Sequence, residues 1–171
     1  MLFRSSTIAG GNLNSASGTY SSILGGTNNY SLLGYSVVLN GNTNCACGTT
    51  NLIGNGNLNN TSSCYSTIIN GLRNCSLSGF STIVNGCCNV ICGGQYDFIG
   101  NGIGNIITGN YSFIGGGNNN NILSQFSTIG GGNGNSASSY YSFIGGGQSK
   151  DRKSTRLNSS HVSESRMPSS A

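Results

Sequence analysis

Single apolar residues recur along this chain every fifteen residues, each set among serine, asparagine and glycine. Aligned from Ser6, the sequence gives nine full repeats, one with an extra residue, and part of a tenth ending at Ser149. Stretches such as YSFIG alternate, placing Ser and Ile on one face of a strand and the aromatic and Thr or Phe on the other. The pattern predicts two short strands per repeat, at positions fifteen to five and ten to thirteen.

A short fixed period with invariant positions is typical of a solenoid, in which each repeat buries its apolar positions only against its neighbours. Fifteen residues are too few for a helix pair and fit a β-coil of two strands and two turns. Coils stacked about 4.8 Å apart would form a rod about 43 Å long. We expect an all-β parallel β-solenoid over residues 6–149. Disordered low complexity is the alternative, but drift would not keep the repeats in register.

Three positions of the repeat are nearly invariant. Position three should lie in the core, and its residues are Ile8, Ile23, Val38, Ile53, Ile68, Ile83, Ile99, Ile114, Ile129 and Ile144. Position six should turn sharply with no Cβ to clash with the next coil, and its residues are Gly11, Gly26, Gly41, Gly56, Gly71, Gly86, Gly102, Gly117, Gly132 and Gly147. Position nine should form a ladder of side-chain amides bonded to one another and to turn backbone, and its residues are Asn14, Asn29, Asn44, Asn59, Asn74, Asn89, Asn105, Asn120 and Asn135.

The composition changes abruptly near the end of the chain. The segment 150–166 holds five of the seven basic residues, two of the three acidic ones and the only His. Without it, the charged residues are Arg4, Arg73 and Asp97, so no basic patch for nucleic acid remains. DRKSTRLNSSH and SRMPSSA resemble one translated frame of a widely used sequencing adapter. We expect residues 150–171 to be an artefactual, disordered tail and residues 1–5 to be the start of a truncated flank.

The repeats lack the residues that catalysis needs. No His, Glu or Lys precedes Lys150, and Asp97 is the only carboxylate there. General acid/base pairs, Ser/His/Asp triads and carboxylate metal sites are therefore excluded, and we expect no catalytic, cofactor-binding or metal-binding residues. Asp97 occupies position one, where other repeats carry Ser or Asn51, which favours drift at a tolerant position over catalysis.

Seven cysteines lie in the middle repeats, namely Cys45, Cys47, Cys64, Cys75, Cys87, Cys88 and Cys92. A disulfide between stacked coils needs the same position in adjacent repeats, and no pair meets that rule. CxxC-type metal pairs are also absent. The main interpretation is that these are small residues filling turn and second-strand positions. Irregular disulfides or free thiols are the alternative, and the redox compartment stays open.

Repeats such as YSFIGGGNNNNILSQF and STIGGGNGNSASSYYSFIGGG resemble the head repeats of trimeric autotransporter adhesins, and related repeats of phage and large-virus fibre proteins. The resemblance covers residues 6–149. It implies a left-handed parallel β-roll and a homotrimer at a cell or virion surface. This chain departs from the family in its longer repeat, its cysteine content and the lack of neck, stalk and anchor.

Apolar residues opposite position three also favour association of chains. Positions two and four carry Phe98, Phe113, Phe143, Leu24, Leu39, Ile69 and Val84. A fifteen-residue coil encloses little volume, so burying this second face between chains would cover an exposed apolar stripe.

We expect a non-enzymatic structural or adhesive rod, extracellular, with a host-surface receptor or glycan as a possible partner. No nucleic acid and no membrane insertion are expected in this fragment. An ice-binding β-solenoid is the alternative, although position two alternates Thr with Phe. A polysaccharide-active β-helix enzyme would need a groove of charged residues that this chain lacks.

Overall fold

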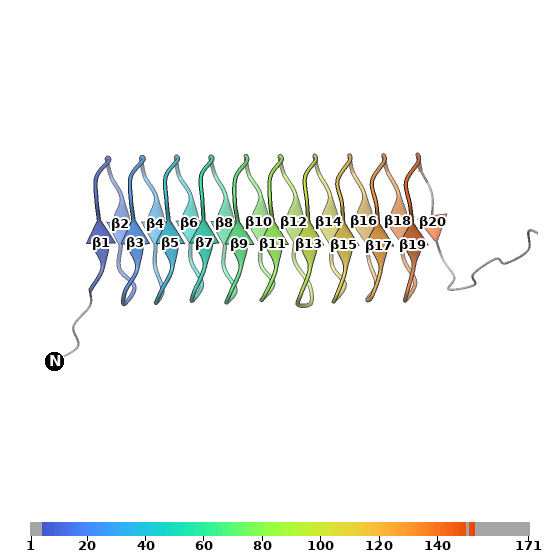
Figure 1. Cartoon of the computed structure of the whole chain (residues 1–171), viewed down its shortest axis with the longest axis horizontal. Coiled ribbons are helices and arrows are strands. Elements are labelled where there is room, and N and C mark those ends of the chain that lie inside the picture. Colours follow the sequence, from blue (N-terminus) through green and yellow to red (C-terminus); the bar gives the residue numbers. More distant parts are fainter. Residues whose placement is uncertain (1–4, 150, 153–171) are drawn as a thin grey trace, which may run out of the picture.

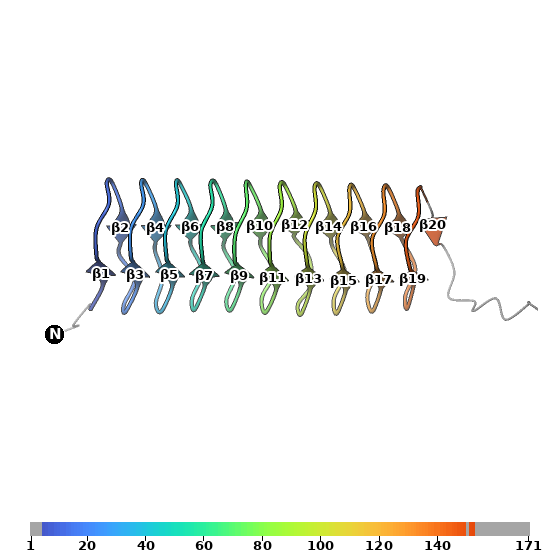
Figure 2. The same cartoon turned by 45° about the horizontal axis from the view of Figure 1, so that its top comes forward.

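In the computed structural model, the chain forms a rod of stacked coils (Figure 1). The structure describes residues 5–149 and, by their backbone alone, 151–152. Within these residues there are twenty strands in two parallel sheets, and no helix. Figure 2 shows that the two sheets run along the rod on opposite sides of every coil. The predicted parallel β-solenoid with fifteen-residue coils is confirmed.

The first sheet contains the strands at positions two and three. They are β1 (Thr7–Ile8), β3 (Ser22–Ile23), β5 (Val37–Val38), β7 (Leu52–Ile53), β9 (Thr67–Ile68), β11 (Thr82–Ile83), β13 (Phe98–Ile99), β15 (Phe113–Ile114), β17 (Thr128–Ile129) and β19 (Phe143–Ile144). The second sheet contains the strands at positions ten and eleven. They are β2 (Ser15–Ala16), β4 (Tyr30–Ser31), β6 (Cys45–Ala46), β8 (Asn60–Thr61), β10 (Cys75–Ser76), β12 (Val90–Ile91), β14 (Ile106–Ile107), β16 (Asn121–Ile122), β18 (Ser136–Ala137) and β20 (Asp151–Arg152). Coils are numbered one to ten from the N-terminus, each starting at position one.

Equivalent positions of successive coils pair directly. Ile23 pairs with Val38 in the first sheet, and Ile107 pairs with Ile122 in the second. A third row of single bridges runs at position seven, from Asn12 onward. The extra residue of coil six is absorbed outside the strands, because Ile83 still pairs with Ile99. Like residues therefore stack on like along the whole rod.

The strands are two residues long, which is shorter than the sequence pattern predicts. Non-glycine residues at positions eight and fifteen have a positive φ, between 50° and 61°, and this ends the extended backbone. The amide then points back along the rod, so that Tyr35 N donates to Thr19 O of the preceding coil at 2.9 Å. In the strands, Ser22 N donates forward to Ser36 O. The aromatic residue at position fifteen is therefore a corner residue, which corrects its placement in the first strand.

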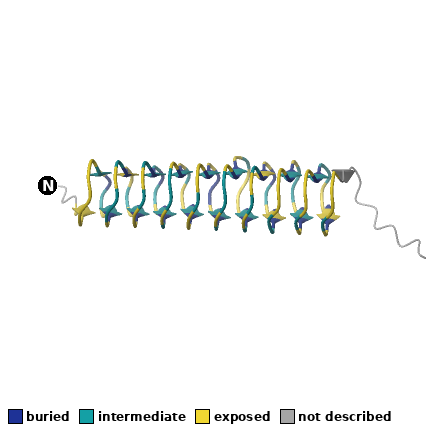
Figure 3. Cartoon of the chain, turned by 90° about the horizontal axis from the view of Figure 1, so that it is seen from above, coloured by how far each residue is buried: buried dark blue, intermediate teal, exposed yellow. Residues whose placement is uncertain are grey.

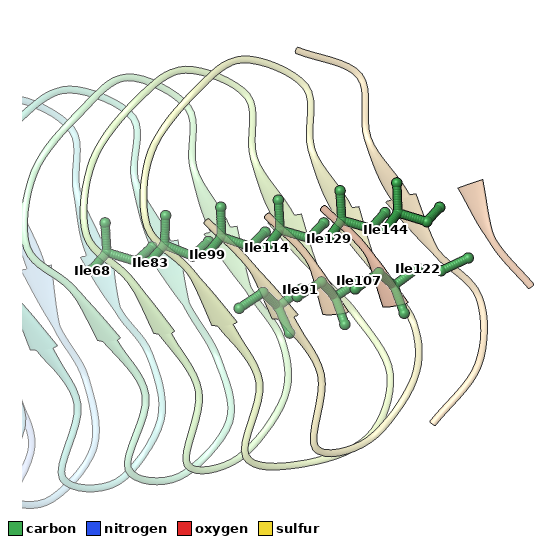
Figure 4. Packing of buried hydrophobic residues seen from close by; sticks show 10 residues of the cluster. Ile68, Ile83, Ile91, Ile99, Ile107, Ile114, Ile122, Ile129 and Ile144 are labelled. Carbon is green, nitrogen blue, oxygen red and sulfur yellow. The ribbon is translucent and has the colours of Figure 1, made fainter. Parts of the chain in front are cut away.

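Two apolar rows face each other across the narrow interior. The isoleucines at position three form one row, and those at position eleven of the later coils form the other (Figure 4). From Ile23 to Ile129, position three is fully buried. Ile8 differs from the expectation, since it is 47% exposed. It lies in the first coil, and no described coil covers it on its N-terminal side.

The sheet also runs slightly past the predicted end of the solenoid. Strand β20 pairs Asp151 with Ser136 and Arg152 with Ala137, at the register expected for positions ten and eleven. Parallel pairing uses backbone groups, so it tolerates residues that break the side-chain pattern. This corrects the boundary placed after Ser149 by two residues of backbone. The remainder of the predicted tail, and residues 1–4 of the predicted flank, lie outside the described residues.

Candidate functional site

The asparagines at position nine form a hydrogen-bonded ladder inside the rod. In coil seven, Asn105 Nδ2 donates to the carbonyl oxygens of Asn101 at 3.2 Å and Gly117 at 3.0 Å. Asn105 Oδ1 accepts from the backbone N–H of Asn120 at 3.0 Å. The same arrangement recurs in neighbouring coils, and Asn29 to Asn135 are buried. A buried amide with partners at both ends is a structural group. Asn14, in the first coil, is only half-buried.

The glycines at position six allow adjacent coils to touch. All ten have a positive φ, between 90° and 118°, in the region that L side chains rarely adopt. A β-carbon on Gly117 would overlap the carbonyl oxygen of Gly132 and crowd Asn120 Nδ2. That same oxygen accepts from Asn118 N at 2.9 Å, so it cannot move away without cost. The structure thus supplies both a conformational and a steric reason for glycine.

A second buried polar row runs at position one. Its buried members are Ser21, Ser36, Asn51, Ser66, Ser81, Asp97, Ser112, Ser127 and Ser142. Serine hydroxyls here donate to turn carbonyls, as Ser66 Oγ does to Ser78 O at 2.7 Å. The sequence pattern placed Ser on the inner face but did not single out this row. Its signal was the recurrence of a small polar residue before each strand.

Asn51 shows how a larger polar side chain fits position one. Its Nδ2 donates to Thr61 O at 3.1 Å, and its Oδ1 accepts from Ser66 N at 2.9 Å. The amide therefore needs both a donor and an acceptor end. Because Thr61 is ten residues further along the same coil, the equivalent carbonyl in coil seven belongs to Ile107.

Asp97 occupies the same position with only half of those contacts. Its Oδ1 accepts from Ser112 N at 2.9 Å, whereas its buried Oδ2 has no hydrogen-bond partner. The residue is 2% exposed. Burial raises the pKa of this carboxyl from 3.8 to about 7, although the hydrogen bond from Ser112 lowers it. Position one is therefore less tolerant than the sequence suggested, and the protonated acid is the form that can replace the amide donor of Asn51.

Aromatic side chains at position fifteen form a ladder along one corner of the rod. The continuous part contains Tyr65, Phe80, Tyr96, Tyr111, Phe126 and Tyr141, with ring centroids 4.8–5.2 Å apart. Tyr20 and Tyr35 stack separately at 5.3 Å, because Thr50 interrupts the ladder. Stacking contributes about 0.5–1.5 kcal/mol per pair. A residue in the left-handed conformation costs roughly 1–2 kcal/mol, which is comparable. Stacking of the rings therefore offsets the conformational cost of the positive φ at position fifteen.

The aromatic ladder limits what can bind to this corner. Neighbouring rings are within 14° of parallel in the continuous part, so each covers the face of the next. The side chains are nonetheless about half exposed, for example Tyr111 at 54%. Ring edges and tyrosine hydroxyls therefore face the solvent. A sugar or other flat ligand has no free ring face to stack on along the run.

The outer face of the first sheet is apolar along most of the rod. In the earlier coils it carries Leu24, Leu39 and Ile69 at position four, which are 42–53% exposed. In the later coils the apolar group moves to position two, where Phe113 and Phe143 are 42% and 65% exposed. Figure 3 shows that exposed and half-buried segments recur from coil to coil along the rod.

Phenylalanine at position two occurs together with glycine at position four. Phe98, Phe113 and Phe143 precede Gly100, Gly115 and Gly145 by two residues. A β-carbon on Gly115 would lie 3.4 Å from the ring of Phe113, so the ring lies across the glycine. Phe98 and Phe113 stack with centroids 5.2 Å apart. Threonines such as Thr67 share position two, so this row is not a uniform array of hydroxyl groups.

The cysteines follow the alternative interpretation of the sequence, an irregular disulfide and free thiols. Cys45 and Cys47 form a disulfide within one coil, with Cα atoms 5.4 Å apart. The same-position rule considered only pairs between coils and missed it. Positions ten and twelve lie on the same face of the coil, and that two-residue spacing was the available signal. The cysteines Cys64, Cys75, Cys87, Cys88 and Cys92 are free thiols.

The described side chains form no cluster of candidate metal ligands. Over residues 5–149, no group of three or more His, Cys, Asp or Glu could hold a metal ion. A shallow hollow between coils one and two is lined by Ser17, Gly18, Thr19, Leu32, Leu33 and Gly34, none of which titrates near neutral pH. In the described part of the chain, no helix has the length and apolarity to cross a membrane. Comparisons with protein-family models and with curated protein sequences find no match.

Proposed function

We propose that this chain is a segment of a non-catalytic structural and adhesive rod, from a surface adhesin or fibre, in which three copies pack side by side. Each chain winds as a left-handed β-roll, and the outer faces of its first sheet meet around a common axis. The repeated outer surfaces that remain then contact a receptor or glycan. The observation that carries the proposal is the exposed apolar face at positions two and four.

The size of that face supports an interface. Leu24, Leu39, Ile69, Phe113 and Phe143 are each about half exposed, and half-buried neighbours lie between them. Together these five side chains expose on the order of 500 Å² of apolar surface, spread along the rod from coil two to coil ten. Burial in a threefold arrangement would remove this surface from water on every chain.

Charge and redox chemistry agree with the proposal. Among the side chains of residues 5–149, Arg73 and Asp97 are the only charged types, and Asp97 is buried. Nothing charged therefore opposes contact between the outer faces. The Cys45–Cys47 disulfide is typical of oxidising compartments, which fits an extracellular location.

The test is the solution mass of the full chain, measured by light scattering after size exclusion under reducing conditions. We expect three chains per particle. The substitution Phe113→Asp places a charge in the interface and should yield folded monomers, with the far-UV circular dichroism unchanged.

The matched control is Leu123→Asp, because Leu123 is 52% exposed but belongs to position twelve on the other sheet. This variant should remain a trimer. A monomeric wild-type chain, or equal dissociation by both substitutions, would contradict the proposal. If the chain is a trimer but binds no member of a glycan array, the proposed trimeric rod stands and the proposed glycan binding is contradicted.

A further inference from the structure

The corner of coil six brings two adjacent thiols together. Cys87 and Cys88 occupy positions seven and eight, and their Sγ atoms are 2.9 Å apart. Side chains of adjacent residues in an extended strand point to opposite faces. Cys88 is not extended, since it has a φ of 59° like the other residues at position eight. The left-handed turn therefore places both sulfur atoms on one side of the backbone.

This convergence belongs to the turn and does not depend on sulfur. In coil three the same two positions hold Asn42 and Thr43, and Thr43 Oγ1 donates to Asn42 Oδ1 at 3.0 Å. Thr43 also has a positive φ, of 54°. Two coils with unrelated side chains thus show the same contact. Any pair of reactive groups at positions seven and eight would be held within reach of each other.

The pair is open to reagents from solution. Cys88 is exposed and Cys87 is partly exposed. The hydrogen bond with Cys88 raises the pKa of Cys87, partial desolvation and the charge of Cys88 add to this, and the positive charge of Arg73 lowers it. Arg73 occupies position eight of the preceding coil, so its positive charge acts on Cys87 from the neighbouring turn.

We propose that Cys87 and Cys88 are a redox modification site that closes to a vicinal disulfide by exchange with small-molecule disulfides such as oxidised glutathione. One thiol loses its proton, and its sulfur attacks the disulfide, releasing one thiolate and leaving a mixed disulfide. The second thiol, also deprotonated, attacks the protein sulfur of that mixed disulfide and releases the second thiolate. The cysteines lose two hydrogens and two electrons, and the oxidant becomes two thiols.

Closure acts locally. A bond between adjacent residues encloses almost no chain, so it restricts the unfolded state far less than a long loop does. Its effect is to close a small ring through the Cys87–Cys88 peptide and to remove two nucleophiles from the rod surface. The site is independent of the proposed trimer, because its evidence is the geometry of a single turn.

The test treats the full reduced chain with graded ratios of reduced to oxidised glutathione, followed by rapid alkylation, proteolysis and mass spectrometry. We expect the peptide with Cys87 and Cys88 to lose two hydrogens and to carry neither alkyl group nor glutathione. Cys64 lies alone on its coil and should carry a glutathione adduct under the same conditions. Stable glutathione adducts on the pair, or links from it to Cys75 or Cys92, would overturn the proposal.

A double variant and a second probe separate the site from unrelated effects. Cys87→Asn with Cys88→Thr installs the side chains of coil three and should abolish the cross-link with an unchanged circular dichroism spectrum. Phenylarsine oxide, which binds two neighbouring thiols, should protect both cysteines of the reduced wild-type chain from alkylation. It should protect neither Cys87 in a Cys88→Ser chain nor Cys64. Equal protection of Cys64 would show that no special pair exists.

Discussion

Coils two to five and coils seven to nine share one backbone but fill it differently. In both regions position three is a buried aliphatic residue. At position eleven the earlier coils carry Ser31, Ala46, Thr61 and Ser76, whereas the later coils carry Ile107, Ile122 and Ala137. The buried apolar residues form two clusters, and the boundary between them falls inside the earlier region, between Ile53 of coil four and Ile68 of coil five. The later region therefore has the thicker apolar interior.

The comparison separates what defines the coil from what stabilises it. Glycine at position six and asparagine at position nine recur in both regions, with the same φ range and the same hydrogen bonds. The apolar filling varies freely around them. Backbone contacts and amide ladders thus set the shape, and the side chains at position eleven set how strongly each coil is held.

The largest effect should come from breaking the shared backbone. Gly117→Ala and Gly41→Ala each force a β-carbon against the next coil at a positive φ, so each should cost at least about 4 kcal/mol of unfolding free energy. The cost should be similar in both regions. Chemical denaturation of each variant measures it. Gly131→Ala is the control, since its β-carbon would meet nothing closer than 3.9 Å.

The second prediction concerns position one, which is Asn51 in the earlier region and Asp97 in the later region. The native pKa of Asp97, about 7, lies above its unfolded value near 3.8, so the native state retains a proton that the unfolded state has lost. Stability should fall as pH rises from about 4 to about 7 and stay low above that range. Asp97→Asn should abolish this slope and add roughly 4 kcal/mol at pH 8. Denaturation at several pH values measures it, and a wild-type stability that rises over this range would contradict the account.

The third prediction compares the stability that an apolar and a polar side chain contribute at position eleven. Ile107→Ala should cost about 3 kcal/mol, because it leaves a cavity between fully buried isoleucines. Ser76→Ala, at the same position of coil five, should cost nothing or stabilise slightly, since the buried Ser76 hydroxyl has no partner. Thermal unfolding of both variants gives the difference. Equal losses would mean that position eleven contributes the same in both regions.

The smallest effect should come from removing an unpaired buried hydroxyl group in the earlier region. Thr61 is fully buried and its Oγ1 has no hydrogen-bond partner. Thr61→Val keeps the shape and removes the unpaired hydroxyl, so it should stabilise the chain by about 1 kcal/mol. Differential scanning calorimetry would detect the increase. Ala46→Ser, which adds a hydroxyl in coil three, is the opposite change and should destabilise.

Much of the fold could be predicted because its determinants repeat. The period, the inward aliphatic row, the asparagine ladder and the glycine turns each depend on one residue type at one position. A single repeat such as STIINGLRNCSLSGF already contains the aliphatic residue, the glycine and the asparagine that these features need, and the repetition supplies the period. Stacking in register then follows, since each position can be satisfied only by its counterpart in the next coil.

Other features could not be predicted from residue type. Tyr111 and its counterparts look like strand residues, because aromatic residues favour strands and rarely adopt a positive φ. Only the stacked rings and the backward hydrogen bond make that conformation favourable, and both require neighbouring coils. The Cys45–Cys47 disulfide and the Cys87–Cys88 contact likewise depend on local backbone direction. The position of the apolar group on the outer face, at Leu39 or at Phe113, was visible in the sequence, but its exposure was not.

The most direct measurement of the central claim is hydrogen–deuterium exchange of the full chain, resolved by peptide along the rod. We predict that the backbone amides of coils seven to nine exchange more slowly than those of coils two to five. The aliphatic row at Ile107 and Ile122 holds the later coils more firmly than Ser31 and Thr61 hold the earlier ones. Uniform exchange, or slower exchange in coils two to five, would contradict the claim that position eleven sets local stability.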